Sequence, residues 1–163
     1  MQPMKPTIHM LCGLPCSGKS TLAKKIETEM KTFTLSLDEW MVAIFGSNHS
    51  DMIGVQYAPK VMLLMNNLRT RLLEYGVDVI IDDGFTTRAS RDVMRKMAME
   101  LGVNYKLYFL SCTEEMLLQR LQRRNANLKD GEVFIPEHKF KKFLEIFEPP
   151  GDDEDFILIS EIT

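Results

Sequence analysis

Residues 13 to 20 read Gly13-Leu14-Pro15-Cys16-Ser17-Gly18-Lys19-Ser20. This stretch matches the phosphate-binding pattern G-x-x-x-x-G-K-S. It lies between an apolar run of strand length, Ile8–Cys12, and a segment with apolar residues at helical spacing, Ser20–Lys31. In such a turn from strand to helix, backbone N–H groups converge on an anion and the helix N-terminus adds partial positive charge. The loop therefore predicts binding of a nucleoside triphosphate.

The residue types inside the loop suit that ligand. Gly13 and Gly18 permit a positive φ and a close approach of the backbone. Lys19 is expected to reach the β- and γ-phosphates, and Ser20 is expected to help hold Mg²⁺. The alternative is a glycine-rich turn with a surface lysine, which the flanking strand and helix pattern disfavours.

Size and composition fit one globular domain over residues 1–163. The chain has 163 residues, 45% of them hydrophobic, and a net charge of −3. Charges of both signs are interspersed, which argues against a protein that mainly coats nucleic acid. No apolar run approaches the ~18 residues of a membrane span. The three cysteines are too few for a disulfide framework. We expect a cytoplasmic protein without a membrane partner.

Apolar runs of strand length alternate with helical patterns, which is typical of an α/β fold with a parallel sheet covered by helices on both faces. The expected strands are Ile8–Cys12, Thr32–Leu37, Val77–Ile81, Tyr105–Leu110 and Phe156–Ile159. A helix is expected from the N-cap candidate Thr113 onward, and others at Ser20–Lys31, Glu39–Phe45, Pro59–Tyr75 and Arg88–Leu101.

Three stretches are predicted to be irregular. Gly46–Gln56 and Asn125–Ile135 are rich in polar and turn-forming residues, and both are candidates to close over substrates. The acidic segment Asp152–Asp155 follows a Pro-Pro-Gly turn signal. We interpret it as a solvated turn rather than a metal site, because carboxylates in a row cannot all face one ion.

Asp38 directly follows the second apolar run. The carboxyl ends of parallel strands line the ligand crevice of an α/β sheet, so Asp38 should emerge beside the phosphate-binding loop. There it would contact the acceptor and take a proton from its hydroxyl during in-line transfer of the γ-phosphoryl group. The alternative is that Asp38 only caps the helix Glu39–Phe45, although one residue can perform both roles.

The third apolar run ends in two acids, Asp82 and Asp83. An acid at the end of a strand in a chain with a phosphate-binding loop can orient Mg²⁺ through water. We prefer Asp82 for this role, because it is the first acid out of the strand.

Arg88, Arg91 and Arg95 lie on one side of the next helix. Their guanidinium groups could bind a phosphorylated or acidic substrate, whereas arginines on a helix more often face solvent. Of the three, Arg88 is the candidate for substrate binding.

A second arginine set, Arg120, Arg123 and Arg124, stands at the end of the helix that begins near Thr113. Cations at this position can simply offset the negative end of the helix dipole. Phosphoryl transfer, however, needs positive charge on the migrating group, and a mobile lid supplies it on closure. We assign Arg120 and Arg124 to such a lid and Arg123 to the exposed surface.

Together, these motifs resemble the AAA-type ATP-binding proteins of the zeta-toxin and polynucleotide-kinase-like group of P-loop kinases. Besides the loop, the resemblance rests on Leu37 to Met41, on Val79 to Arg88, on Arg120-x-x-x-Arg124-Asn125 and on Phe147-Glu148-Pro149-Pro150. It covers about residues 8–155.

The resemblance implies a P-loop three-layer sandwich whose five-stranded parallel sheet has the order 2-3-1-4-5. It places Asp38 on the general-base position and Arg120 and Arg124 on the lid arginines. It also implies ATP and Mg²⁺ as cofactors, with the nucleotide held by Gly13, Leu14, Pro15, Cys16, Ser17, Gly18, Lys19, Ser20 and Thr21.

Two residues depart from the pattern of the group. Cys16 stands where such loops usually carry glycine, so the turn must accommodate a side chain there. Met41 replaces the arginine that polynucleotide 5′-kinases of the group present to the acceptor phosphate. The second departure disfavours a nucleic-acid acceptor.

The leading hypothesis is a kinase that transfers the γ-phosphoryl group of ATP to a hydroxyl of a small-molecule or nucleotide-type acceptor. One alternative is a polynucleotide 5′-kinase, and another is an ATP-binding switch or interaction protein with little transfer activity. The sequence has no N-K-x-D tetrapeptide that reads guanine, which favours ATP over GTP.

Overall fold

A five-stranded parallel sheet forms the centre of the protein in the computed structural model, which describes residues 5–47, 50–129 and 132–160. Its order is β2-β3-β1-β4-β5, which confirms the predicted sheet. The strands are β1 (Thr7–Cys12), β2 (Phe33–Leu35), β3 (Val79–Gly84), β4 (Asn104–Leu110) and β5 (Ile157–Ile159). Because β1 is central, the loop that follows it emerges in the middle of the carboxyl edge of the sheet.

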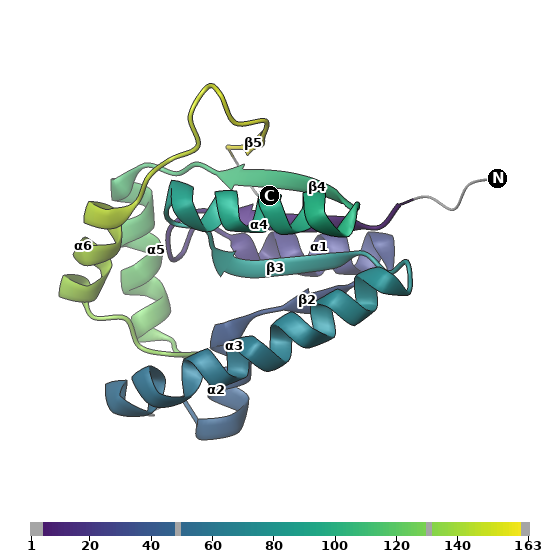
Figure 1. Ribbon diagram of the computed structural model, residues 1–163. Coiled ribbons are helices and arrows are strands. Elements are labelled where there is room, and N and C mark those ends of the chain that lie inside the picture. Colours follow the sequence, from purple (N-terminus) through teal and green to yellow (C-terminus); the bar gives the residue numbers. More distant parts are fainter. Residues whose placement is uncertain (1–4, 48–49, 130–131, 161–163) are drawn as a thin grey trace.

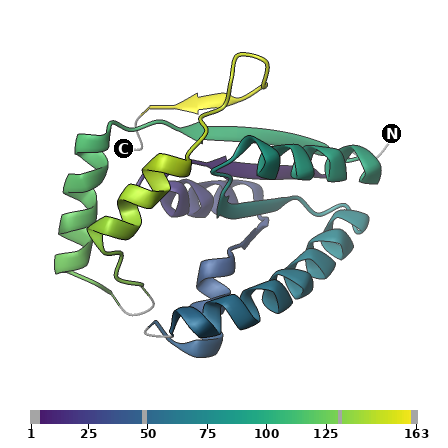
Figure 2. The same cartoon turned by 60° about the vertical axis from the view of Figure 1, so that its left-hand side comes forward.

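Helices cover both faces of the sheet, as predicted. They are α1 (Lys19–Met30), α2 (Leu37–Phe45), α3 (Asp51–Glu74), α4 (Arg88–Leu101), α5 (Glu114–Ala126) and α6 (Glu137–Ile146). In Figure 1, α1 lies behind the sheet while α3 and α4 lie in front of it. Figures 1 and 2 agree that α5 and α6 stand at the carboxyl edge, beside the loop that follows β1.

The two faces of the sheet have separate cores, because successive side chains of a strand point to opposite faces. On one face, Ile8 and Ile81 pack in a cluster with Val61 and Met65 of α3. On the other face, the core consists of Leu11, Leu22, Ala23, Ile26, Ile80 and Leu110, three of them from α1. Burial on both faces explains the continuous apolar runs in the sequence.

A third cluster holds α5 and α6 against the loop that follows β1. It consists of Leu14 from this loop, Leu117 and Leu121 from α5, and Phe140 from α6. Phe140 is completely buried. This packing fixes the position of α5, and with it the arginines near its end.

The prediction that Gly46–Gln56 is a loop is wrong from residue 51 onward, because α3 begins at Asp51 rather than at Pro59. Ser50 caps the helix by accepting a hydrogen bond from Ile53 N at 3.4 Å. Tyr57 and Ala58 pack on the core, and this packing holds the helix through the proline. Residues 48–49 of the predicted loop lie outside the described residues.

Two strand ends also differ from the prediction. β2 stops at Leu35 because Ser36 already caps α2. β3 continues to Gly84, so Asp82 and Asp83 lie within the strand and point to opposite faces. In the part of the chain that the structure describes, no helix combines the length and apolar character needed to cross a bilayer.

Candidate functional site

The predicted phosphate-binding loop joins β1 to α1. Gly13 leaves no room for a side chain, because a Cβ atom there would lie 2.7 Å from Ser17 Oγ and 3.0 Å from the carbonyl oxygen of Leu110. Gly18 precedes α1 with a φ of 101°, in the region that favours glycine. The geometry of the turn therefore requires both glycines of the motif.

Cys16 adopts a φ of 66°, which places a non-glycine residue in the left-handed region. Such a conformation costs an L-residue roughly 1–2 kcal/mol. The expectation that this turn accommodates a side chain in place of glycine is thus met at the cost of backbone strain. The Cys16 side chain is half-buried and lines the cleft in front of the loop.

Lys19 folds back over the loop. Its Nζ donates hydrogen bonds to the carbonyl oxygens of Gly13 at 3.0 Å and Leu14 at 2.9 Å. Burial lowers the pKa of Lys19, while the nearby carboxylates of Asp82 and Asp38 oppose that shift. Lys19 and the two acids therefore interact electrostatically in one site.

Ser20 and Asp82 form a pair suited to a hard cation. Ser20 Oγ donates a hydrogen bond to Asp82 Oδ2 at 2.9 Å. Burial raises the pKa of Asp82, and Lys19 and the Ser20 hydrogen bond oppose this. Within the described residues, no three His, Cys, Asp or Glu side chains gather into a metal site. One hydroxyl and one carboxylate fit Mg²⁺, which usually takes few protein ligands together with substrate phosphates.

Asp83 points to the other face of β3 and has a different set of partners. Its Oδ1 accepts a hydrogen bond from Leu37 N at 3.2 Å, which ties β3 to the start of α2. Its charge also acts on Arg69 of α3, which is only 4% exposed and which belongs to no motif in the sequence. These contacts separate the two acids and leave Asp82 beside Ser20, so the choice of Asp82 for Mg²⁺ stays a prediction.

Asp38 lies in the first turn of α2 and is exposed to the cleft. The helix cap is Ser36, whose Oγ accepts a hydrogen bond from Glu39 N at 3.4 Å. The alternative that Asp38 only caps this helix is therefore wrong. Its carboxylate is free of a capping role and close enough to Lys19 to influence its pKa.

The arginines near the end of α5 reach the loop at Cys16. Arg120 Nη1 donates to the carbonyl oxygen of Cys16 at 3.4 Å. Arg124 Nη1 lies 4.0 Å from Cys16 Sγ, and its Nη2 donates to the carbonyl oxygen of Val133 at 3.1 Å. Arg123 is exposed, as predicted, although it also lines the cleft. The fold thus brings Arg120 and Arg124 over the phosphate-binding loop.

The segment between α5 and α6 is held at both ends. Asn125 lies within α5, not in the loop as predicted, and its side-chain amide binds Ile135 N and O. Lys139 of α6 forms an ion pair with Asp51 of α3 at 2.9 Å, which joins α6 to the opposite side of the cleft. Residues 130–131 of the predicted loop lie outside the described residues.

One open cleft of about 960 Å³ unites these groups. Of the predicted nucleotide-binding residues, Leu14 and Ser17 have buried side chains behind the loop. The others line the cleft: Gly13, Pro15, Cys16, Gly18, Lys19, Ser20, Thr21, Arg120 and Arg124. Asp38 and Asp82 line it as well, so the cleft holds all the predicted catalytic and metal-binding residues.

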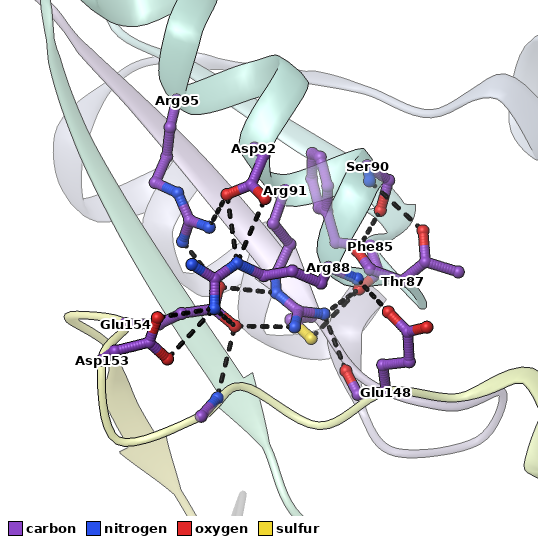
Figure 3. A network of polar contacts seen from close by, with 12 residues as sticks. Phe85, Thr87, Arg88, Ser90, Arg91, Asp92, Arg95, Glu148, Asp153 and Glu154 are labelled. Atoms are coloured by element: carbon purple, nitrogen blue, oxygen red, sulfur yellow. Dashed lines mark hydrogen bonds and ion pairs between the residues drawn. The ribbon is translucent and has the colours of Figure 1, made fainter.

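Arg88 is the exception among the predicted site residues. Its Nε binds Asp92 at 3.1 Å and its Nη1 binds Asp153 at 2.9 Å, and it does not line the cleft. Its guanidinium lies instead in the network of Figure 3, which joins α4 to the segment before β5. The expectation that Arg88 contacts substrate therefore needs correction, because two carboxylates already engage this side chain.

Arg91 and Glu154 form the buried centre of this network (Figure 3). Both side chains are 1% exposed, and two parallel hydrogen bonds of 2.7 and 2.8 Å join them. Arg95 binds the same carboxylate at 2.6 Å. The expectation that arginines on this helix face solvent is thus wrong for Arg91. The acidic segment Asp152–Asp155 is not fully solvated either, because Glu154 turns inward.

The sequence matches the family model described as an AAA domain over residues 8–150. This chain belongs to that family. No curated protein matches the sequence significantly.

Several solved structures share the fold of this AAA-domain protein. In the Pnkp1/Rnl/Hen1 RNA repair complex, the match has 22% identity and a TM-score of 0.70, and it covers 88% of this chain and 44% of that chain. A putative kinase from Chloroflexus aurantiacus has 15% identity, a TM-score of 0.71, and coverages of 96% and 87%. Kti12 from Chaetomium thermophilum, in complex with ADP-AlF3, has 14% identity, a TM-score of 0.71, and coverages of 94% and 88%. The AAA-domain protein thus has a P-loop kinase-like fold and spans less than half of the RNA repair chain.

Proposed function

We propose that this protein is an ATP-dependent kinase that transfers the γ-phosphoryl group to a hydroxyl of a small-molecule or nucleotide-type acceptor. The proposal rests on one observation: Lys19, the Ser20–Asp82 pair, Asp38 and the two lid arginines meet in one cleft. These are the groups that phosphoryl transfer needs, since its catalysis consists mainly of positioning and electrostatic stabilisation.

Each group has a role in this proposal. The backbone N–H groups of the loop and Lys19 bind the nucleotide phosphates. Ser20 and Asp82 hold Mg²⁺, which supplies positive charge to the phosphate oxygens. Asp38 accepts the proton of the acceptor hydroxyl.

The acceptor would bind at the wall of the cleft that α2 and α3 form. The residues of this wall favour a small molecule over a phosphorylated polynucleotide. Met41, where an arginine would contact an acceptor phosphate, is apolar and only 4% exposed. Val42, Gly54 and Ala58 continue this wall from α2 and α3. The polynucleotide alternative draws support from the RNA repair relative and from Arg123 and Lys129, two exposed cations that line the cleft.

A phosphorylation screen tests the proposal. The protein would be incubated with γ-labelled ATP and Mg²⁺ in three parallel reactions, which contain a fractionated metabolite pool, 5′-hydroxyl oligonucleotides, or water as the only acceptor. We expect label in a metabolite fraction. Label in the oligonucleotides would favour the polynucleotide alternative. Tight ATP binding without label transfer in any reaction would contradict a kinase and favour a nucleotide-dependent switch.

Asp38→Asn is expected to lower the rate of acceptor phosphorylation by about 10²-fold, because an amide cannot take the proton. The affinity for ATP should stay within about threefold, since Asp38 acts on the acceptor rather than on the nucleotide. Steady-state kinetics and nucleotide titration on the same preparation measure both quantities. Glu39→Gln, in the same turn of the same cleft wall, is the matched control. A parallel loss of ATP affinity would make Asp38 a metal-binding or structural residue instead.

Lys19→Ala is expected to weaken ATP·Mg²⁺ binding by about 10- to 100-fold, because a hydrogen bond to a charged group is worth about 1.5–3 kcal/mol. Calorimetric titration measures the change. Lys25→Ala, an exposed lysine of the same helix, should leave the affinity unchanged. Unchanged affinity in Lys19→Ala, with a normal melting temperature, would refute the assignment of the phosphate-binding loop.

A further inference from the structure

The three cysteines lie close to the phosphate-binding loop but in different environments. Cys12, the last residue of β1, is completely buried, and its Sγ donates to the carbonyl oxygen of Phe85 at 3.4 Å. Cys16 and Cys112 are half-buried free thiols. Of the three, only Cys16 lines the cleft. Cys16 is therefore the thiol that faces the space where a nucleotide would bind.

Two guanidinium groups converge on the half-buried thiols. Arg124 Nη1 lies 4.0 Å from Cys16 Sγ, and Arg120 Nη1 lies 3.5 Å from Cys112 Sγ and 3.4 Å from the carbonyl oxygen of Cys16. The thiols of Cys16 and Cys112 and the guanidinium groups of Arg120 and Arg124 thus form one cluster beside the loop.

The positive charges of this cluster have no carboxylate ion-pair partner among residues 5–47, 50–129 and 132–160. In the described part of the chain, neither Arg120 nor Arg124 forms an ion pair, and Arg124 Nε is buried without a hydrogen-bond partner. Arg91, by contrast, has a bidentate carboxylate partner in Glu154. Reactive cysteines lie in electropositive, partially exposed surroundings, and Cys16 beside Arg124 has such surroundings.

We propose that Cys16 is a covalent modification site, and that its oxidation by hydrogen peroxide blocks nucleotide binding at the loop. The thiolate sulfur attacks one peroxide oxygen, an S–O bond forms and the O–O bond breaks. The departing hydroxide takes a proton and leaves as water. Sulfur is oxidised by two electrons to the sulfenic acid, and peroxide is reduced by the same two electrons.

The effect on nucleotide follows from the position of Cys16 within the loop. An oxygen atom on Sγ adds bulk at the cleft wall, at a residue already held in a left-handed conformation. It also gives Arg124 a new hydrogen-bond acceptor, so that this cation is drawn away from the phosphates. This consequence rests on the proposed function, whereas the oxidation chemistry at Cys16 does not.

The other two cysteines serve as internal controls. Burial raises the pKa of Cys12 to about 11, so this thiol stays protonated at neutral pH. Cys112 has an arginine neighbour like Cys16, and its Sγ lies 3.8 Å from the carbonyl oxygen of Ser17, but it does not line the cleft. The expected order of reactivity is therefore Cys16, then Cys112, then Cys12.

Peptide mass spectrometry tests the site. The folded protein would be treated with limiting hydrogen peroxide and trapped with dimedone, with and without ATP·Mg²⁺. We expect the label on Cys16 first, and we expect ATP·Mg²⁺ to slow the labelling of Cys16 at least about fivefold while that of Cys112 changes little. Labelling of Cys112 or Cys12 before Cys16 would overturn the proposal, whether or not the protein binds ATP.

Nucleotide titration tests the consequence. Oxidation is expected to weaken ATP·Mg²⁺ binding at least about tenfold, and thiol reduction should restore it. The ATP affinity of Cys16→Gly, a substitution that suits the positive φ, should be the same before and after peroxide treatment, whereas that of Cys112→Ser should still fall on treatment. Equal peroxide sensitivity in Cys16→Gly would refute the role of Cys16. An untreated protein that does not bind ATP would refute the proposed function, and the labelling order would still decide the modification site.

Discussion

The double variant Arg120→Ala/Arg124→Ala is expected to bind ATP·Mg²⁺ almost normally and to lose kcat by about 10³- to 10⁵-fold. This is the range for an arginine that stabilises the charge of the transferring phosphoryl group. Both side chains lie over the phosphate-binding loop at Cys16, where the migrating phosphoryl group is expected. An interaction that strengthens in the transition state affects kcat more than ground-state affinity.

The competing explanation makes a different prediction. Cations that only offset the dipole at the end of α5 would each contribute at most about 1 kcal/mol of stability and nothing to the rate per folded molecule. Measurement of kcat and melting temperature on one preparation separates the two. Arg123→Ala is the matched control, because Arg123 is an exposed cation of the same helix that also lines the cleft. A lower melting temperature with intact kcat would contradict the lid assignment.

The sequence predicted the parts of the site that lie in short local motifs. The loop from Gly13 to Ser20 combines a strand, a turn and a helix N-terminus within a few residues, so its geometry follows from local chemistry. The shared placement of Arg120 and Arg124 was also predictable, because their spacing puts them on one side of α5. The sheet order, by contrast, came from the family resemblance.

The errors arose where a distant contact outweighs local preference. Pro59 suggests a helix start, but packing of the preceding turns on the core extends α3 back to Asp51. Arg69 carried no sequence signal, because its neighbour Asp83 comes from another element. The periodicity of α4 shows which arginines share a face, but it cannot show that Glu154, 63 residues later, meets Arg91 there.

The Arg91–Glu154 pair links α4, the residue after β3 and the segment before β5. Arg91 Nη1 also donates to the carbonyl oxygens of Phe85 at 3.0 Å and Glu148 at 2.8 Å, so it joins the end of β3 to the segment before β5. Gly84, next to Phe85, accepts a hydrogen bond from Gly13 N at 3.0 Å. The buried pair therefore supports the strand end that carries Asp82, from behind the cleft.

Glu154→Ala is expected to lower the free energy of unfolding by about 3–5 kcal/mol, because it leaves the buried charge of Arg91 without its partner. Chemical denaturation measures the loss, and Asp152→Ala, an exposed acid in the same turn, should change stability by less than about 0.5 kcal/mol. The double variant Arg91→Met/Glu154→Leu should recover much of the loss, since it removes both charges. A double variant that is no more stable than Glu154→Ala would show that the hydrogen bonds of Arg91, rather than its charge, hold the three segments together.

The same pair predicts a dependence of stability on pH. Hydrogen bonds from Arg91 and Arg95 lower the pKa of Glu154 from its usual 4.5 to about 2. Because the folded protein binds this proton less readily than the unfolded chain, the contribution of Glu154 to stability is complete above about pH 4.5. It is lost progressively as the pH falls from about 4.5 to about 2. Denaturation curves between pH 2 and 6 should therefore show a steeper loss of stability for the wild-type protein than for Arg91→Met/Glu154→Leu. Parallel curves would mean that Glu154 titrates alike in the folded and unfolded chains, which would refute a charged buried pair.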